Sequence, residues 1–493
     1  MDISVFGIDI GTTKLVIAQL HSRTFTFILN NENKNVTPTY SYYQNQDVEI
    51  YGRKAKEVSV RNYEHIFYDS KRLIGQCINS KLINTYRNYW SFSIDSKLDD
   101  KSGKVYYKNS DGELICPVKV IADWLNLIIQ NKSEIQVRIV YPAAFTSIQK
   151  LALIKAAEKT NAKVDRLVPK AIAGLISYHD RMKSTKDTTS FIFTLGGGTL
   201  DTTIVQYLHS SETYKVLISN GDSELGGRDF DLVVVKIMEE KLSSQVDFNH
   251  FQGLKRKAKT RLKILQKASG IKEDLSETES ETLPLSDIYH DAKDDEILRS
   301  EFHEKSKHLI QRIRKVCQLT VSEAKKAEIQ IDEVLLFGMA SSMAFVKEMM
   351  KEFFGSEVKI HKSTGMTLDF ARGAALSPLF KVKNISYYPI GIQLPNEGPK
   401  IIFEKNLPLP KTISVDFEVV NQDRLVIPIY EVLSSRIQET TPFADLVMEN
   451  IPEGKVTVII DFLLDKSGML HTTAKVKGKN ELITQVKCRY QFD

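Results

Sequence analysis

Cysteine and tryptophan are scarce in this chain of 493 residues, and no apolar run is long enough to cross a membrane. The four cysteines are widely separated, at Cys77, Cys116, Cys317 and Cys488. Their spacing fits neither a compact zinc site nor a disulfide framework, so we expect reduced thiols in a cytoplasmic protein. The first residues lack the basic segment and apolar run of a signal peptide, and we expect no membrane attachment.

An excess of charge of one sign is also lacking. The 67 Lys and Arg residues nearly balance the 62 Asp and Glu residues, and the net charge of +5 is spread along the chain, which gives no reason to expect DNA binding. One basic run, LKRKAKTRLK at residues 254–263, could contact ribosomal RNA, although such a run is more often the solvated face of a helix. The 42% hydrophobic and 26% charged residues are typical of a soluble globular protein.

Two short stretches are near copies of each other. Residues 6–17 read FGIDIGTTKLVI, and residues 191–205 read FIFTLGGGTLDTTIV. Each combines an apolar strand, a glycine turn with hydroxyl residues and a second strand, which predicts a tight β-hairpin. Backbone amides at such a turn can approach an anion closely. Two such hairpins in one chain indicate a duplicated domain that closes on a phosphate from both sides, as in an actin-like ATP site.

The remaining pattern predicts an α/β chain followed by a β-rich unit. Helices are predicted over 117–131, 149–161, 165–182 and 301–327, and buried strands over 137–142 and 334–338. From about residue 387 the chain has short strands separated by Pro, Gly and Asn turns, which predicts a separate small β-domain.

The chain resembles the DnaK-type, seventy-kilodalton heat-shock family. The resemblance lies in GIDIGTT at 7–13, YDSKRLIG at 68–75, GGGTLD at 196–201 and GDSELGGRDFD at 221–231, with looser matches at 405–410 and 461–470. It implies an actin-like duplicated nucleotide-binding domain with ribonuclease H-like halves over residues 1–380. It also implies an interdomain linker over 381–388 and a truncated substrate-binding-type β-sandwich over 389–493, with no helical lid.

The resemblance also assigns roles in an ATP or ADP site with Mg²⁺. Lys71 would stabilise charge beside the attacked phosphate, Asp9 would hold the water shell of the magnesium, and Asp201 would support that shell. Donors to phosphate oxygens would be Thr12, Thr13, Gly197, Gly198 and Thr199. The other nucleotide-binding residues that it implies are Gly11, Lys14, Gly196, Gly226, Gly227, Lys263 and Gly338.

The two hairpins differ at one chemically important position: Asp9 in the first corresponds to Thr194 in the second. The family pattern has aspartate at both positions, and it has a glutamate where this chain has Lys170. The two changes make the surroundings of the metal three charge units more positive, and each unit is worth roughly 4 kcal/mol at about 4 Å with an effective dielectric constant of about 20. We therefore expect weak or lost hydrolysis. In the alternative, Lys170 turns out to solvent and leaves a weakened metal site.

The base pocket and the linker also depart from the family pattern. By alignment Ile264 and Ser342 replace two arginines that stack on adenine, so nucleotide binding is expected to be weakened or lost. Further changes around the base and ribose are Met339, Lys267 and Thr367. The linker FKVKNISYY at 380–388 is basic, where the family has an acidic docking segment, so we expect weaker coupling between nucleotide and peptide sites.

In the β-domain, Phe417 and Leu425 fall where residues lining a peptide pocket would lie. The alternative is that both belong to the core of a small sandwich. Pro428 removes a hydrogen-bond donor from its strand, which predicts an edge or bent strand.

These observations leave three readings. The favoured one is an atypical co-chaperone that resembles the degenerate chaperone subunit of the ribosome-associated complex. Its partners would be unfolded or nascent polypeptides, a J-domain co-chaperone and the ribosome. The second is a conventional ATP-hydrolysing folding chaperone, and the third is an actin-fold metabolite kinase, which the C-terminal β-domain disfavours.

Overall fold

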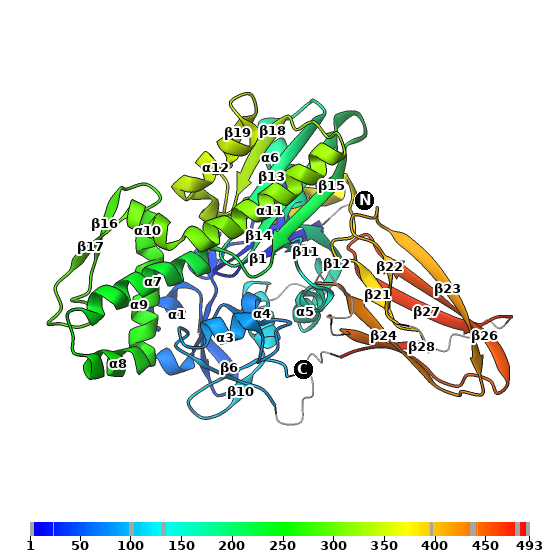
Figure 1. Ribbon diagram of the computed structural model, residues 1–493, viewed down its shortest axis with the longest axis horizontal. Coiled ribbons are helices and arrows are strands. Elements are labelled where there is room, and N and C mark those ends of the chain that lie inside the picture. The colour runs from blue at the N-terminus through cyan, green and yellow to red at the C-terminus, as the bar shows by residue number, and fades with distance from the viewer. Residues whose placement is uncertain are drawn as a thin grey trace.

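The computed structural model describes residues 4–22, 24–97, 103–129, 135–394, 398–433, 440, 442–478 and 484–489. Figure 1 shows two α/β halves joined to a β-sandwich that lies at one end of the molecule. No helix in these ranges is long and apolar enough to span a membrane.

Each α/β half is built on one sheet, and the two sheets have the same topology. The first has the order β12–β11–β1–β2–β3, with β1 Ser4–Ile10, β2 Lys14–His21, β3 Thr24–Phe27, β11 Ile135–Tyr141 and β12 Ala162–Pro169; β4 Thr37–Pro38 also pairs with β2. The second has the order β19–β18–β13–β14–β15–β20, with β13 Thr188–Leu195, β14 Leu200–Leu208, β15 Thr213–Asp222, β18 Glu333–Phe337, β19 Lys359–Lys362 and β20 Lys381–Lys383.

The strand directions confirm the predicted duplication. The antiparallel hairpin β1–β2 corresponds to β13–β14, and the parallel neighbour β11 of β1 corresponds to the parallel neighbour β18 of β13. Both predicted glycine hairpins are therefore present at equivalent places in an actin-like duplicated fold.

Two helices, α6 (Lys170–Met182) and α13 (Asp369–Leu376), pack against each other between the sheets. The contact is close because Gly373 has no side chain: a Cβ atom there would lie 1.7 Å from the carbonyl oxygen of Ala173. Helix α13 also packs on β1 and β2, whereas α6 packs on β12 and β13. The helix pair thus fixes the two hairpins relative to each other.

Further elements extend each half at the outer side of the cleft. In the first half they are β5 Tyr40–Gln44, β6 Asp47–Tyr51, α1 Arg53–Val58, β7 Ile66–Tyr68, α2 Ser70–Leu73, α3 Lys81–Tyr86, β8 Ser93–Asp95, β9 Tyr106–Lys108, β10 Leu114–Ile115, α4 Pro117–Ile129 and α5 Ser147–Glu158. In the second they are α7 Gly227–Ser243, α8 Phe248–Arg256, α9 Ala258–Asp274, β16 Ser280–Leu283, β17 Asp295–Leu298, α10 Arg299–Lys305, α11 Lys307–Lys326 and α12 Ala344–Phe354.

The helix predictions are confirmed over 117–129 (α4) and 149–158 (α5), and corrected at two others; residues 130–131 lie outside the described part of the chain, and 159–161 follow the end of α5. Residues 165–169 belong to β12, because they pair with β11 and only Lys170 begins the helix. The helix predicted over 301–327 is interrupted at Ser306, which is fully buried between α10 and α11.

The C-terminal unit is a sandwich of two antiparallel sheets. One has the order β22–β21–β24–β25–β28, with β21 Ile390–Ile392, β22 Lys400–Phe403, β24 Leu425–Glu431, β25 Ala444–Met448 and β28 Thr484–Cys488. The other has the order β23–β26–β27, with β23 Lys411–Val420, β26 Lys455–Leu464 and β27 Leu470–Val476.

Pro428 lies in β24, which is an interior strand, so the prediction of an edge strand is wrong. The position tolerates proline because β21 ends at Ile392, before it reaches Pro428. The carbonyl of Pro428 accepts from the amide of Gln393, but the reciprocal bond that an N–H at position 428 would donate to Gln393 is missing, so the ladder between β21 and β24 ends here.

The basic linker docks on the second sheet although it has no acidic segment. Lys381–Lys383 forms β20, which runs parallel to β15. Val382 packs against the buried core, whereas the Lys381 and Lys383 side chains are exposed. Because strand addition relies on backbone hydrogen bonds, the lysine charges do not prevent docking.

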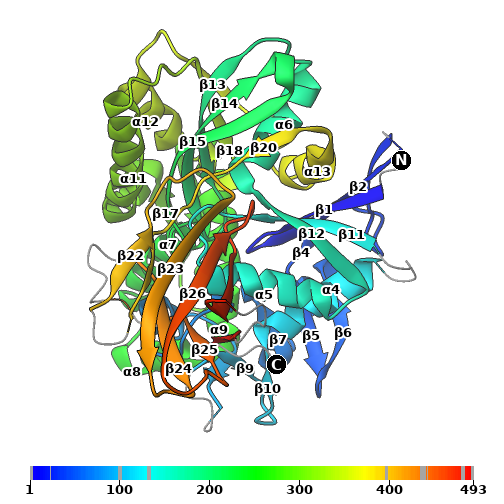
Figure 2. The same cartoon turned by 90° about the vertical axis from the view of Figure 1, so that its right-hand side faces the viewer.

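The sandwich lies against α5 and the linker, as Figures 1 and 2 show from two directions. The buried carboxylate of Glu431, at the end of β24, accepts hydrogen bonds from the backbone amide of Ser147 at 2.8 Å and from its hydroxyl at 2.9 Å. Ser147 is the first residue of α5, where the helix dipole favours an anion. In addition, the Tyr388 hydroxyl donates to the carbonyl of Ala144 at 2.9 Å.

We predict that Glu431→Ala separates the sandwich from α5. The change removes charge-assisted hydrogen bonds worth about 1.5–3 kcal/mol. Small-angle scattering should report a larger radius of gyration than for the unmodified chain. Glu453→Ala, at an exposed position of the same sandwich, is the matched control and should leave the radius unchanged. Equal radii for the two variants would contradict the assigned role of Glu431.

Candidate nucleotide site

A cavity of about 1030 Å³ lies between the two halves. It is lined from the first half by residues that include Thr13, Lys14 and Tyr40, and from the second by residues that include Gly197 and Gly227. The predicted nucleotide-binding residues Thr13, Lys14, Gly197 and Gly227 therefore lie together in one cleft. Both hairpin turns face it, as the duplication predicts.

The two turns share one geometry and contact each other. The amide of Gly11 donates to the carbonyl of Lys14 at 2.8 Å, and the amide of Gly196 donates to the carbonyl of Thr199 at 3.0 Å. A Cβ atom on Gly197 would lie 3.3 Å from the Cβ atom of Thr12. The tips of the two turns are thus in contact, with the threonines of the first turn beside the glycines of the second.

Two more glycines hold the second turn in place. A Cβ atom on Gly226 would lie 2.4 Å from the amide nitrogen of Gly198, so only glycine allows the start of α7 to come this close. The amide of Gly227 donates to the carbonyl of Gly196 at 2.8 Å. Gly338, at φ +85°, lies directly behind Leu195 and supports the turn from outside the cavity.

The predicted catalytic groups are buried at the base of the turns. Exposures are 7% for Asp9, 3% for Lys71 and 1% for Asp201. Burial, reinforced by the nearby Lys170, lowers the pKa of Lys71 to about 7. Burial raises the pKa of Asp201 to about 6, although Lys170 and the amide of Ala144 oppose the shift.

Lys170 does not turn out to solvent. Its side chain is 6% exposed, and its Nζ lies 3.2 Å from the position that a Cβ atom of Gly196 would occupy. The ammonium also lies 4.5 Å from the centre of the Phe370 ring. It is close enough to Lys71 and Asp201 to influence the pKa of both groups. The positive charge of Lys170, which replaces a glutamate of the family pattern, therefore lies beside the Gly196 turn.

The donor set does not fit a magnesium ion. The two carboxylates, Asp9 and Asp201, are balanced by the two ammonium groups of Lys71 and Lys170. Among the described residues no group of three or more His, Cys, Asp or Glu side chains could hold a metal. A divalent ion at about 4 Å from the Lys170 ammonium would be repelled by roughly 8 kcal/mol at an effective dielectric constant of about 20. Anionic phosphate oxygens meet no such repulsion.

The base-proximal part of the prediction needs correction on α9. The predicted residues Lys263 and Lys267 both reach Asp287, and neither lines the cavity. Ile264 is buried in the core. The α9 side chains that line the cavity are Gln266, Ser269, Lys272 and Glu273. The spacing of these four follows one helix face, which is the signal that the alignment missed.

On the other side of the cleft the positions singled out from the sequence face the cavity. Ser342, Met339 and Thr367 all line the cavity. With Met366 also present, this wall is partly apolar and carries no arginine to stack on a base.

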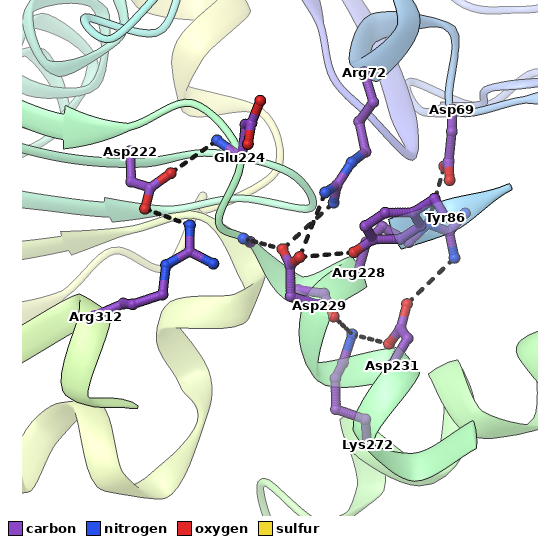
Figure 3. Close-up of polar contacts among 12 residues, drawn as sticks. Asp69, Arg72, Tyr86, Asp222, Glu224, Arg228, Asp229, Asp231, Lys272 and Arg312 are labelled. Carbon is purple, nitrogen blue, oxygen red and sulfur yellow. Dashed lines mark hydrogen bonds and ion pairs between the residues drawn. The ribbon is translucent and has the colours of Figure 1, made fainter. Parts of the chain in front are cut away.

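Below the Gly226 turn a buried network of charges joins the two halves (Figure 3). Arg228 of α7 donates to Asp69 of the first half at 3.0 Å and to Asp231 at 3.3 Å. Asp231 also accepts from Lys272 at 2.5 Å. All four side chains are less than a tenth exposed, so the bonds are shielded from water.

A second contact of the same kind lies beside it (Figure 3). The carboxylate of Asp229 accepts from the Tyr86 hydroxyl at 2.7 Å, from the Gly226 amide at 2.7 Å and from Arg72 at 3.4 Å. Arg72 and Tyr86 belong to the first half, whereas Asp229 begins α7 of the second. Specific hydrogen bonds and ion pairs therefore join the two halves below the cleft.

The phosphate turn is connected to the linker through one backbone segment. The Oδ1 atom of Asp201 accepts from the amide of Ala144 at 3.2 Å. The carbonyl of the same residue accepts from Tyr388, just after β20. A displacement of Asp201 can therefore be transmitted to the linker through two hydrogen bonds.

The duplicated α/β fold with two glycine turns facing one cleft defines a protein of the actin-like nucleotide-binding class. The chain belongs to the Hsp70 family, because the sequence model described as "Hsp70 protein" matches residues 5–488.

Individual relatives agree with this assignment. The chain is 26% identical to the chaperone protein DnaK of Stenotrophomonas maltophilia (strain R551-3), over 97% of this chain and 77% of that protein. It is 26% identical to the chaperone protein DnaK of Carsonella ruddii (strain PV), over 96% of this chain and 81% of that protein. It is 25% identical to the chaperone protein DnaK of Psychrobacter cryohalolentis, over 96% of this chain and 75% of that protein.

We predict that Arg228→Met lowers the free energy of unfolding by about 3–5 kcal/mol, because it leaves Asp69 buried without its cation and removes one of the two cations of Asp231. Chemical denaturation measures the change. Arg53→Met is the matched control: Arg53 forms an exposed ion pair with Glu57, and its loss should cost less than about 0.5 kcal/mol. A similar small cost for both variants would show that the buried network does not stabilise the closed cleft.

Proposed function

We propose that this protein is an Hsp70-type co-chaperone that binds ATP or ADP and hydrolyses ATP weakly or not at all. The single observation that carries the proposal is the buried Lys170 ammonium beside the Gly196 turn. It adds positive charge where phosphoryl transfer needs a tightly held metal cluster. The site keeps its ability to attract phosphate and loses part of what hydrolysis requires.

The chain's own groups have distinct roles in this proposal. The turn amides and the hydroxyls of Thr12 and Thr13 donate to phosphate oxygens, and Lys71 balances their charge. Asp201 is fixed through one oxygen by the amide of Ala144. Its Oδ2 atom is buried and has no hydrogen-bond partner among the described residues, so it is available to orient a water molecule. Weak hydrolysis can arise at that point.

The proposed clients are unfolded or nascent polypeptides, and the proposed partners are a J-domain co-chaperone and the ribosome, in the cytoplasm. Family membership supports polypeptide binding by the sandwich. Phe417 and Leu425, however, both pack with the sandwich core, so we do not assign the cleft to them. Co-sedimentation with ribosomes tests the partner assignment, and its absence from the ribosomal fraction would count against that part.

A conventional ATP-hydrolysing chaperone is the second candidate. It is favoured by the retention of Lys71, Asp9 and Asp201 in one buried group. Single-turnover hydrolysis, measured beside a DnaK protein, separates the two candidates. We expect a rate far below that of the DnaK protein, and a comparable rate would favour the second candidate instead.

We predict that the double variant Thr194→Asp with Lys170→Glu increases magnesium-dependent hydrolysis. The two changes together make the site three charge units more negative, which restores the acidity that a metal–water cluster requires. Single-turnover rates with and without magnesium measure the gain. The control is Thr188→Asp with Lys163→Glu, which makes the same two changes away from the cleft on β13 and β12. No gain in a folded double variant would remove the charge argument.

A further inference from the structure

Lys71 and Lys170 are buried at the base of the two turns, and neither ammonium group forms a direct ion pair. Lys71 is 3% exposed and Lys170 is 6% exposed. In the described part of the chain, neither Nζ atom has a carboxylate oxygen within 4.0 Å or a hydrogen-bond partner. Each instead lies near an aromatic ring, Phe145 for Lys71 at 5.3 Å and Phe370 for Lys170 at 4.5 Å. Asp9 and Asp201 act on these charges only from a distance, so both ammonium groups are available to pair with an anion that enters.

Lys170 does not stabilise its own helix, and its side chain extends toward the cleft instead. It is the first residue of α6, where the partial positive charge of the helix dipole opposes a cation. No acidic residue in the first turn offsets it. The side chain instead extends to the Gly196 turn, where the phosphate-binding amides converge.

The carboxylate side of the site is correspondingly weak. Thr194 lies opposite Asp201 in the β13–β14 ladder, and its hydroxyl is fully buried with no hydrogen-bond partner among the described residues. A neutral hydroxyl here cannot offset the charge of Lys170. The local charge of Asp9, Asp201, Lys71 and Lys170 together is zero before any ligand enters.

We propose that this cleft binds the polyphosphate of a nucleotide without a divalent metal, and that the Lys170 ammonium takes over the charge neutralisation that a metal would provide. The inference rests on the nucleotide binding proposed above. It identifies the ligand as the metal-free nucleotide. Lys71 and Lys170 neutralise the phosphate oxygens from the two halves, and the turn amides orient them.

The preference for metal-free nucleotide predicts the direction in which magnesium changes the binding affinity. Magnesium converts free nucleotide into its metal complex, which this site disfavours, so added magnesium lowers the apparent affinity. A site that needs the metal gives the opposite response.

Isothermal titration calorimetry of the full chain tests the proposal with two probes, ADP and tripolyphosphate, each in EDTA and in excess magnesium. We expect both probes to bind in EDTA and to bind more weakly in magnesium. Lys170→Met should weaken binding in EDTA by about tenfold to a hundredfold, as for the loss of hydrogen bonds to a charged group. Lys163→Met, at an exposed position on β12, is the matched control and should bind like the unmodified chain.

Each outcome decides one claim. Binding of both probes only with magnesium, or unchanged binding in a folded Lys170→Met variant, overturns the inference and leaves the proposed nucleotide binding intact. Binding of tripolyphosphate but not ADP in EDTA supports the metal-free site and removes the nucleotide from the proposed function. No binding of either probe under either condition overturns both. If Lys170→Met does not fold by circular dichroism, the metal response of the unmodified chain still decides the inference.

Discussion

The close packing of α6 against α13 is the constraint on which the site depends. Helix α13 packs on β1 and β2 of the first half, whereas α6 packs on strands of both halves, including β12 and β13, so the contact between the helices sets how far apart the two hairpins lie. Gly373 makes the approach possible, because any side chain there would collide with the backbone of α6. The same helix α6 begins with Lys170, so the element that joins the halves also carries the unusual charge to the phosphate turn. Architecture and electrostatics at this site therefore have a common origin.

The sequence could predict the features that local chemistry dictates. Both glycine hairpins, the helix α4 and the strand β11 follow from apolar periodicity and turn residues. The meeting of the two turns also followed, because duplication implies symmetry. Asp9, Lys71 and Asp201, which lie in or next to these local patterns, come together in one buried group, while their roles remain predictions.

The predictions that depended on tertiary structure were less successful. Alignment to the family pattern placed Lys263, Ile264 and Lys267 of α9 near the nucleotide, and only packing reveals that Gln266, Ser269, Lys272 and Glu273 face the cavity. The fate of the Lys170 side chain could not follow from sequence, because a flexible stem can reach either solvent or the site. The pairing of the linker with β15 could not follow from the sequence, because the charges of Lys381 and Lys383 are visible there and the backbone pairing of β20 is not; the expected weaker coupling stays a prediction.

The buried bonds around Arg228 have a kinetic consequence. Asp69, Arg228, Asp231 and Lys272 form a chain across the halves that water cannot easily enter. Any separation of the two halves has to break these bonds and hydrate their charges in a transient state. The rate at which the cleft widens then depends on how readily these four charges become hydrated.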